Sequence, residues 1–203
     1  MKILLIGPQG CGKGTIGQLL SRKTALPLLS VGDLLRSVDE SFEFYQEIKN
    51  ELERGVLVSE DIMVKLLTTE LSKEVYKEGY IFDGWARSMS NLKAFDPGFD
   101  FVIVFEMSRE TSLKRISGRR ICSADGKTYN IYTLPKEELE KCTGELVQRG
   151  DDTEEAVKKR LDIYYSETAK VIDYYDKLGK SIHVNAEPLP NVVFADLMSK
   201  LGL

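Results

Sequence analysis

Short apolar runs alternate along the chain with longer stretches in which apolar residues recur every three or four positions. Short runs are typical of strands buried on both faces of a sheet, and the longer periodicity is typical of amphipathic helices. The strand-like runs are residues 2–6, 28–30, 80–82, 101–105 and 181–184. The helix-like stretches are residues 16–23, 60–76, 109–117, 153–177 and 192–201.

Strands that alternate with helices and lack tight hairpins predict an α/β fold, with a parallel sheet flanked by helices. Ligands bind to such sheets beyond the carboxyl ends of the strands. The 203 residues suit one domain with inserted segments. Residues 32–58 form a charged helical stretch outside the alternation, and residues 119–150 contain only short apolar runs. Because a structureless loop of that length is unusual in a compact domain, we expect residues 119–150 to be an active-site lid.

Composition narrows the class of protein. The net charge is −4 and there is no block rich in lysine or arginine, so neither nucleic acid nor an anionic membrane is an expected partner. Met1 and Lys2 lead directly into the first strand, and no apolar run approaches the roughly 20 residues of a membrane helix. The cysteines Cys11, Cys122 and Cys142 are far apart, so we expect no disulfide framework. We therefore expect a soluble, cytoplasmic enzyme. A monomer is a separate expectation that composition does not establish.

The most specific motif is the glycine-rich run of residues 7–15, Gly-Pro-Gln-Gly-Cys-Gly-Lys-Gly-Thr, directly after the first predicted strand. Glycines allow backbone N–H groups to surround a polyphosphate, and Lys13 is placed to reach its outer phosphates. The helix that follows directs its positive end at the same group. This run predicts a P-loop NTPase-type sheet and a bound nucleoside triphosphate.

Charged residues elsewhere suggest phosphoryl transfer. That reaction needs positive charge around the moving group, donors that align both substrates, and exclusion of water. Arginine suits this role because its planar fork binds phosphate oxygens in pairs, although any one arginine alone is more often a solvated surface residue. The candidates are Arg36, Arg87, Arg119, Arg149 and Arg160.

Asp83 ends a predicted strand at the ligand-binding edge of the sheet. A carboxylate there is placed to hold Mg²⁺ through water, because Mg²⁺ keeps much of its hydration shell. The alternative is a turn or N-cap aspartate before Gly84.

In these motifs the chain resembles the adenylate kinase family of nucleoside monophosphate kinases over nearly its whole length. The matching segments are residues 7–15, 30–36, 55–58, 83–87, 118–120, 148–152 and 157–161. The resemblance implies a core of residues 1–29, 59–118 and 151–203, a monophosphate-binding flap of residues 30–58, and the long type of lid over residues 119–150. Asp151 and Asp152 would lie near the hinge of that lid.

The resemblance also implies the site residues. The ATP-binding set would be Gly10, Cys11, Gly12, Lys13, Gly14, Thr15, Arg115 and Arg119, with Arg115 as a stacking partner for the base. The monophosphate-binding set would be Val31, Arg36, Val58, Gly84, Arg87, Asn91, Arg149 and Arg160. The catalytic residues would be Lys13, Arg87, Arg119, Arg149 and Arg160, of which the last three would close over the transferring group.

The implied reaction is ATP + AMP ⇌ 2 ADP with Mg²⁺. Two departures favour a UMP/CMP kinase instead, because Val31 stands where adenylate kinases usually have threonine, and Asn91 where they usually have a base-reading glutamine. The long lid is typical of bacterial adenylate kinases, and on balance we favour adenylate kinase. A non-catalytic P-loop module is disfavoured, since it has no need of arginines converging from five segments.

Four further expectations concern single positions. Ala86 replaces a proline that in the family follows a cis bond, and we predict a trans Trp85–Ala86 bond, because a cis one costs roughly 2.5–4 kcal/mol.

Family members often hold zinc in the lid. Three of the usual zinc-ligand positions are occupied here by residues that can bind zinc, namely Cys122, Asp125 and Cys142. A structural zinc site requires four ligands, so we favour a metal-free lid. His183 is expected at a core or edge position. Cys11 is interpreted as a space-filler whose pKa the adjacent helix N-terminus lowers.

Overall fold

The structure is a computed structural model that describes residues 1–53, 58–150 and 152–203. Two parts of the motifs named above, residues 55–57 and Asp151, lie outside the described residues.

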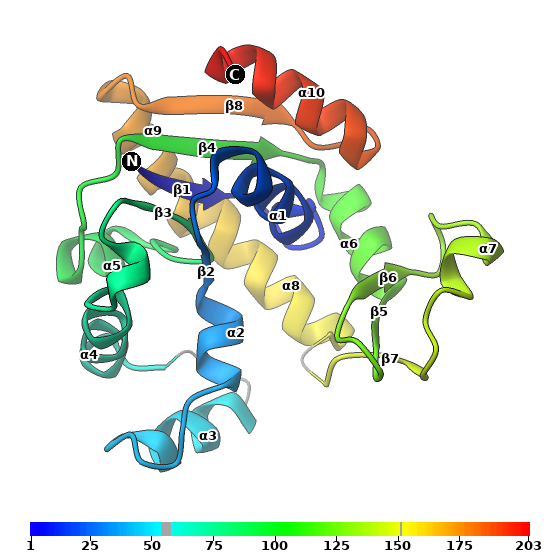
Figure 1. Cartoon of the computed structure of the whole chain (residues 1–203), viewed down its shortest axis with the longest axis horizontal. Coiled ribbons are helices and arrows are strands. Elements are labelled where there is room, and N and C mark those ends of the chain that lie inside the picture. The colour runs from blue at the N-terminus through cyan, green and yellow to red at the C-terminus, as the bar shows by residue number, and fades with distance from the viewer. Residues whose placement is uncertain (54–57, 151) are drawn as a thin grey trace.

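The centre of the molecule is a five-stranded sheet in which every neighbouring pair runs parallel. Its strand order is β2-β3-β1-β4-β8 (Figure 1). The strands are β1 (Lys2–Ile6), β2 (Leu28–Ser30), β3 (Tyr80–Asp83), β4 (Phe101–Glu106) and β8 (Ser181–Asn185). All the strand-like runs predicted from the sequence form these strands, so the α/β prediction is confirmed. The carboxyl end of β1, which leads into the glycine-rich loop, lies between those of β3 and β4.

Helices flank this sheet and fill the connections between its strands. Those of the core are α1 (Lys13–Thr24), α4 (Glu60–Leu71), α5 (Met89–Ala94), α6 (Arg109–Ser117), α8 (Glu154–Ile163), α9 (Ala169–Lys177) and α10 (Pro190–Leu201). A short 3₁₀ turn (Glu74–Tyr76) follows α4, and a π-helical segment (Tyr164–Thr168) joins α8 to α9. No helix within the described ranges is long and apolar enough to cross a bilayer.

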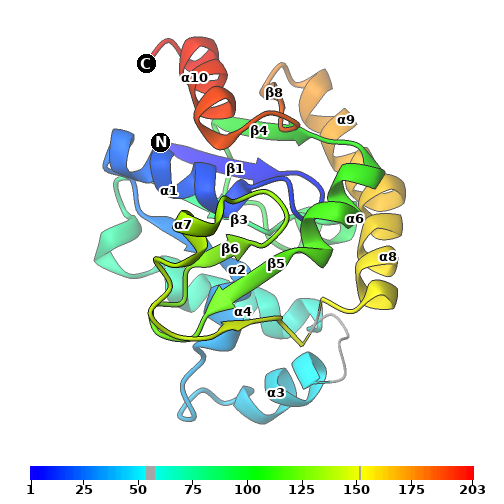
Figure 2. The same ribbon diagram turned by 90° about the vertical axis from the view of Figure 1, so that its right-hand side faces the viewer.

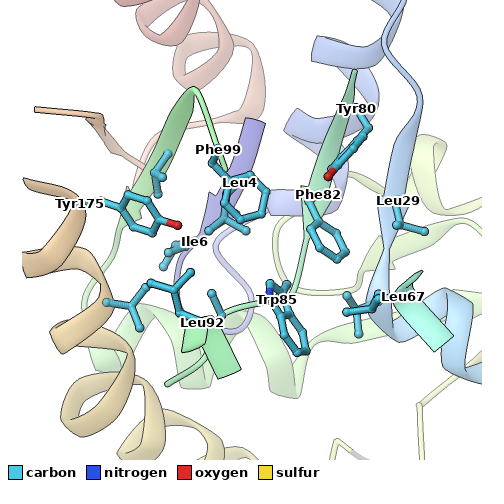
Figure 3. Close-up of a cluster of buried hydrophobic side chains, with 14 of the residues drawn as sticks. Leu4, Ile6, Leu29, Leu67, Tyr80, Phe82, Trp85, Leu92, Phe99 and Tyr175 are labelled. Carbon is cyan, nitrogen blue, oxygen red and sulfur yellow. The ribbon is translucent and has the colours of Figure 1, made fainter. Parts of the chain in front are cut away.

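Alternate residues of β1 are buried in two different clusters, which explains its unbroken apolar sequence. Leu4 and Ile6 belong to an aromatic-rich cluster with side chains from α4, α5 and α9 (Figure 3). Ile3 and Leu5 face the opposite cluster, which α1 and α10 cover. Because both faces of the sheet are covered, the glycine-rich loop extends from a rigid support.

Two inserted segments lie outside this core. The flap segment, residues 30–58, contains α2 (Val31–Arg36) and α3 (Tyr45–Glu53). The lid segment, residues 119–150, contains a separate antiparallel sheet of order β6-β5-β7 and a short helix (Figure 2). Its elements are β5 (Arg119–Cys122), β6 (Thr128–Asn130), α7 (Lys136–Leu139) and β7 (Leu146–Val147).

The Trp85–Ala86 bond is trans, as predicted, since the described residues contain no cis peptide bond. The local rearrangement is a left-handed backbone at Ala86, with φ of 53°. That conformation costs a non-glycine residue roughly 1–2 kcal/mol. Trp85 compensates by stacking on Phe82 in the core and donating a 2.9 Å hydrogen bond to the carbonyl of Phe95.

His183 lies on the edge strand β8, so its predicted edge position is confirmed. Its Nδ1 is 2.8 Å from Glu106 Oε1, and its Nε2 is 2.8 Å from Asp176 Oδ1. The hydrogen bond to Asp176, with that to Glu106 and both carboxylate charges, raises the pKa of His183 above its ordinary value despite partial burial. The two carboxylates therefore favour the imidazolium form.

We predict that Gly7→Ala lowers the free energy of unfolding by about 1–3 kcal/mol, the scale of an overpacked core. A β-carbon at Gly7 would lie 2.8 Å from both Cys11 Sγ and Phe105 Cβ. Gly14→Ala, in the first turn of α1 within the same glycine-rich run, is the matched control, because a β-carbon there meets nothing within 4 Å. Urea unfolding of both variants measures the difference, and equal stabilities would contradict the close packing at Gly7.

We also predict that His183 stabilises the fold in a pH-dependent way. A raised folded-state pKa gives stability that is complete below the unfolded pKa of about 6.5 and is lost as pH rises through the folded value. The stability difference between the wild type and His183→Gln should therefore shrink between about pH 6 and pH 9. Urea unfolding at both pH values tests this. A difference that is the same at both would show that the carboxylates do not favour the imidazolium.

Candidate nucleotide-binding and phosphoryl-transfer site

The glycine-rich loop connects the end of β1 to the start of α1. Gly10 and Gly12 have left-handed backbones, with φ of 81° and 93°, which permits the turn. Gly12 precedes α1 and no side chain caps this helix end. The first backbone N–H groups of α1 therefore remain available to an anion, as the sequence predicts.

Helix α6 holds the loop from behind, which the sequence did not reveal. The Ser112 hydroxyl is buried and donates to the carbonyl of Gln9. A β-carbon on Gly10 would lie 3.2 Å from Ile116 and 3.3 Å from the Cβ of Arg115. The loop is therefore fixed from both of its ends and from α6.

The ammonium of Lys13 lies over its own loop. Its Nζ donates to the carbonyls of Gly7 at 2.7 Å and Pro8 at 3.1 Å, and it is 3.6 Å from Cys11 Sγ. The expectation of a lowered thiol pKa is wrong, because burial raises the pKa of Cys11 even though Lys13 opposes it. Cys11 is 3% exposed, which agrees with its interpretation as a space-filler.

Asp83 ends β3, with Leu5 of β1 and Ser30 of β2 as its partners in register. Burial raises the pKa of its carboxyl, and the charges of Lys13 and Arg87 oppose that change. The carbonyl of Arg87 accepts a 2.8 Å hydrogen bond from Thr168 Oγ1 in the π-helical segment. Residues from separate segments thus meet at this edge of the sheet.

The flap and lid segments border one cavity of about 410 Å³. Arg36 pairs with Asp33 on α2 of the flap segment. Burial acts to raise the pKa of Asp33, but hydrogen bonds from Arg36 and Ser30 and the charges of Arg36 and Arg149 lower it overall. The cavity is lined by Asp33, Arg36, Ile121, Gly126, Val147, Gln148, Arg149 and Gly150.

Asp152 joins two of the predicted arginines. Arg119 Nε donates to Asp152 Oδ2 at 2.7 Å, and Arg119 Nη2 donates to Oδ1. Arg160 Nη2 is 3.5 Å from the same Oδ1. The carboxylate side chain is fully buried and that of Arg119 is 18% exposed. One carboxylate therefore orients an arginine from the start of the lid segment and another from α8.

Arg115 binds the loop that follows β8. Its guanidinium donates to the carbonyls of Ala186 at 2.8 Å and Glu187 at 2.6 Å. These bonds fix the side chain at the surface of α6, and its stacking on a base stays a prediction.

Asn91 is hydrogen-bonded to Glu60, a residue that the sequence reasoning missed. Asn91 Nδ2 donates to Glu60 Oε1 at 2.8 Å, and Ser90 Oγ donates to the same oxygen at 2.6 Å. Ser88 caps this start of α5 by accepting from the Asn91 N–H. Val31 and Val58, also predicted at the monophosphate site, both pack in the aromatic-rich cluster.

The lid cysteines correct the expectation that the chain has no disulfide. Cys122 and Cys142 form a disulfide, with their Cα atoms 5.7 Å apart, although they are 20 residues apart in sequence. Hydrogen bonds between Ser123 and Glu145 bring their two segments together. Because both sulfurs are oxidised, the proposed zinc set has no thiolate, and Asp125 instead pairs with Lys127. No cluster of potential ligands able to hold a metal occurs among the residues that the structure describes.

Comparison with known proteins agrees with this arrangement. The family model described as "Adenylate kinase" matches residues 5–180. The chain belongs to the adenylate kinase family. It is 35% identical to an adenylate kinase of Treponema denticola, covering 98% of this chain and 99% of that protein. It is 40% identical to an adenylate kinase of Thermosipho africanus, covering 91% and 92%, and 35% identical to one of Clostridioides difficile, covering 100% and 99%.

We predict that this family member, purified without reductant and then denatured, has one thiol that reacts with a chromogenic thiol reagent. That thiol is Cys11, the free cysteine, and all three should react after reduction. Metal analysis of the same sample should find no stoichiometric zinc. If all three thiols react before reduction and the sample contains near-stoichiometric zinc, the lid binds zinc and the disulfide is not formed.

Proposed function

We propose that the chain is an adenylate kinase that transfers the γ-phosphoryl group of ATP to AMP and forms two molecules of ADP. The observation that best supports this is the cavity between the flap and lid segments, which Arg36 and Arg149 both line. A site for one nucleotide has no need of phosphate-binding residues on two separate inserted segments. The chemistry requires two bound nucleotides with the acceptor oxygen in line with the γ-phosphorus.

In this proposal the two nucleotides occupy opposite sides of the sheet edge. The loop amides of residues 10–15 and Lys13 bind the triphosphate, while Arg36 and Arg87 bind the phosphate of AMP. Arg119, Arg149 and Arg160 surround the γ-phosphoryl group and stabilise the charge on its oxygens. The acceptor oxygen forms its bond to phosphorus as the bond to the β–γ bridging oxygen breaks. Closure of the flap and lid segments excludes water and prevents hydrolysis.

Asp83 suits the Mg²⁺ that this reaction uses. Carboxylate oxygens are preferred ligands of Mg²⁺, and Asp83 is partly buried beside Lys13 and Arg87 at the sheet edge. Bound Mg²⁺ neutralises charge on the phosphate oxygens. The cytoplasmic location, the monomeric state and the domain boundaries expected from the sequence stay predictions.

A UMP/CMP kinase is the second candidate function. Two observations favour it, namely the buried apolar side chain of Val31 and the short carboxamide of Asn91. Its mechanism would be the same with a pyrimidine monophosphate as acceptor. Steady-state assays with ATP and either AMP, CMP, UMP or GMP separate the candidates, because adenylate kinase requires the highest kcat/KM for AMP. A non-catalytic module would bind ATP and consume none of the four.

We predict that Lys13→Ala and Arg87→Ala each lower kcat by at least about 100-fold, the scale for losing one preorganised charged contact. Lys23→Ala and Arg22→Ala are matched controls, because both residues are exposed in the last turn of α1. The controls should retain the wild-type rate. Near-normal turnover in a folded Lys13 or Arg87 variant would remove that residue from the proposed site.

A further inference from the structure

A hydrogen-bonded group links the start of α4 to the start of α5. Glu60 is the first residue of α4, and its Oε1 accepts from Ser90 Oγ at 2.6 Å and Asn91 Nδ2 at 2.8 Å. Ser88 Oγ lies 2.9 Å from Ser90 Oγ and also accepts from the Asn91 N–H. Both Glu60 and Asn91 are partly buried. The carboxamide of Asn91 is therefore held at a defined position.

Glu60 also determines the orientation of the Asn91 carboxamide, that is, which of its two polar atoms faces Glu60. An ionised carboxylate only accepts hydrogen bonds, whereas a carboxamide has a donating nitrogen and an accepting oxygen. Asn91 must therefore present Nδ2 to Glu60. Its Oδ1 receives no hydrogen bond from any donor in the described ranges. The carboxylate is itself favoured in the first turn of α4 by the positive end of the helix.

The surroundings of the pair place it beside the proposed monophosphate site. Val58 precedes Glu60 by two residues, Met89 precedes Asn91 by two, and both pack in the cluster that contains buried Val31. A β-carbon on Gly84 would lie 3.8 Å from Val31 Cβ and 3.9 Å from Arg87 Nη2. The Asn91–Glu60 pair is thus next in sequence to residues of an apolar cluster that also borders Arg87, the arginine proposed to bind the phosphate.

We infer that Glu60 determines base specificity by fixing the Asn91 carboxamide with its oxygen available to the acceptor base. This rests on the proposed function. A fixed acceptor selects a base that carries an amino group at the facing position, as in AMP or CMP. It rejects a base with an oxo group there, as in IMP, GMP or UMP, because two acceptors would be placed against each other. Glu60 is a positioning residue that acts through Asn91 and does not contact the reacting atoms.

The cleanest probe is the pair AMP and IMP, because IMP has the 6-oxo group of GMP without its 2-amino group. Wild-type protein should favour AMP over IMP by at least about 100-fold in kcat/KM, since a site with a fixed hydrogen-bonding group strongly rejects a mismatched partner. Glu60→Met keeps the side-chain length and removes the acceptor, so Asn91 can rotate and donate to the 6-oxo group. That variant should lower the AMP-to-IMP ratio at least about tenfold, mainly through KM, with kcat for AMP changed less than about threefold.

Three further variants exclude a merely structural role. Glu60→Gln keeps a hydrogen bond to Asn91, but it can donate to Oδ1 as well as accept from Nδ2, so it should lower the AMP-to-IMP ratio even though the contact is retained; a purely structural contact would leave the ratio unchanged. Asp61→Ala removes the neighbouring exposed carboxylate from the same turn of α4 and should leave the ratio unchanged. Asn91→Ala should lower the ratio by itself, and adding Glu60→Met to it should lower the ratio no further.

The outcomes separate the two proposals. An active wild type with an unchanged ratio in folded Glu60→Met overturns the specificity inference and leaves the kinase function standing. A uniform loss of kcat for both nucleotides also overturns it, because a structural defect does not distinguish bases. If Glu60→Met does not fold, an unchanged ratio in Asn91→Ala overturns the inference equally. A wild type that phosphorylates no monophosphate overturns the proposed function, and this inference with it.

Discussion

The carboxylate of Asp152 binds two arginines that come from different parts of the chain. Removing one partner from a buried ion pair typically costs 3–5 kcal/mol, because it leaves an uncompensated charge. The side chain of Asp152 is fully buried, so Arg119 and Arg160 each offset part of the free-energy cost of removing its charge from water. The carboxylate in return holds two cations near each other that would otherwise repel. The base of the lid segment and helix α8 are connected through this one side chain.

Other cations of the proposed site are also held by acceptors of the protein. Lys13 is held by loop carbonyls, Arg36 by Asp33, and Arg115 by carbonyls after β8. Each has an acceptor within its own chain before any phosphate binds, and the contacts of Lys13 and one of those of Arg115 are less exposed than that of Arg36. Preorganised charge of this kind needs little rearrangement during the reaction, which is the main requirement of phosphoryl transfer.

The local sequence was sufficient to predict the strands of the core, but it did not predict the contacts between distant segments. The five strands were predictable because each contains a short apolar run set between longer helical stretches. The lid strands were missed because they are only two to four residues long and partly exposed. Ser112 and Glu60 were missed because their partners are 103 and 31 residues away in sequence. The motifs contained both the candidate arginines and the carboxylates Asp33 and Asp152, but they did not reveal that these residues pair.

The disulfide between Cys122 and Cys142 changes what the lid segment depends on in the cell. A lid held by zinc loses its closure when chelators or metal starvation remove the ion, and it withstands mild reductants. Here the lid segment is closed by a covalent bond that thiol reductants break. The order of this lid segment is therefore coupled to the thiol–disulfide balance of its compartment.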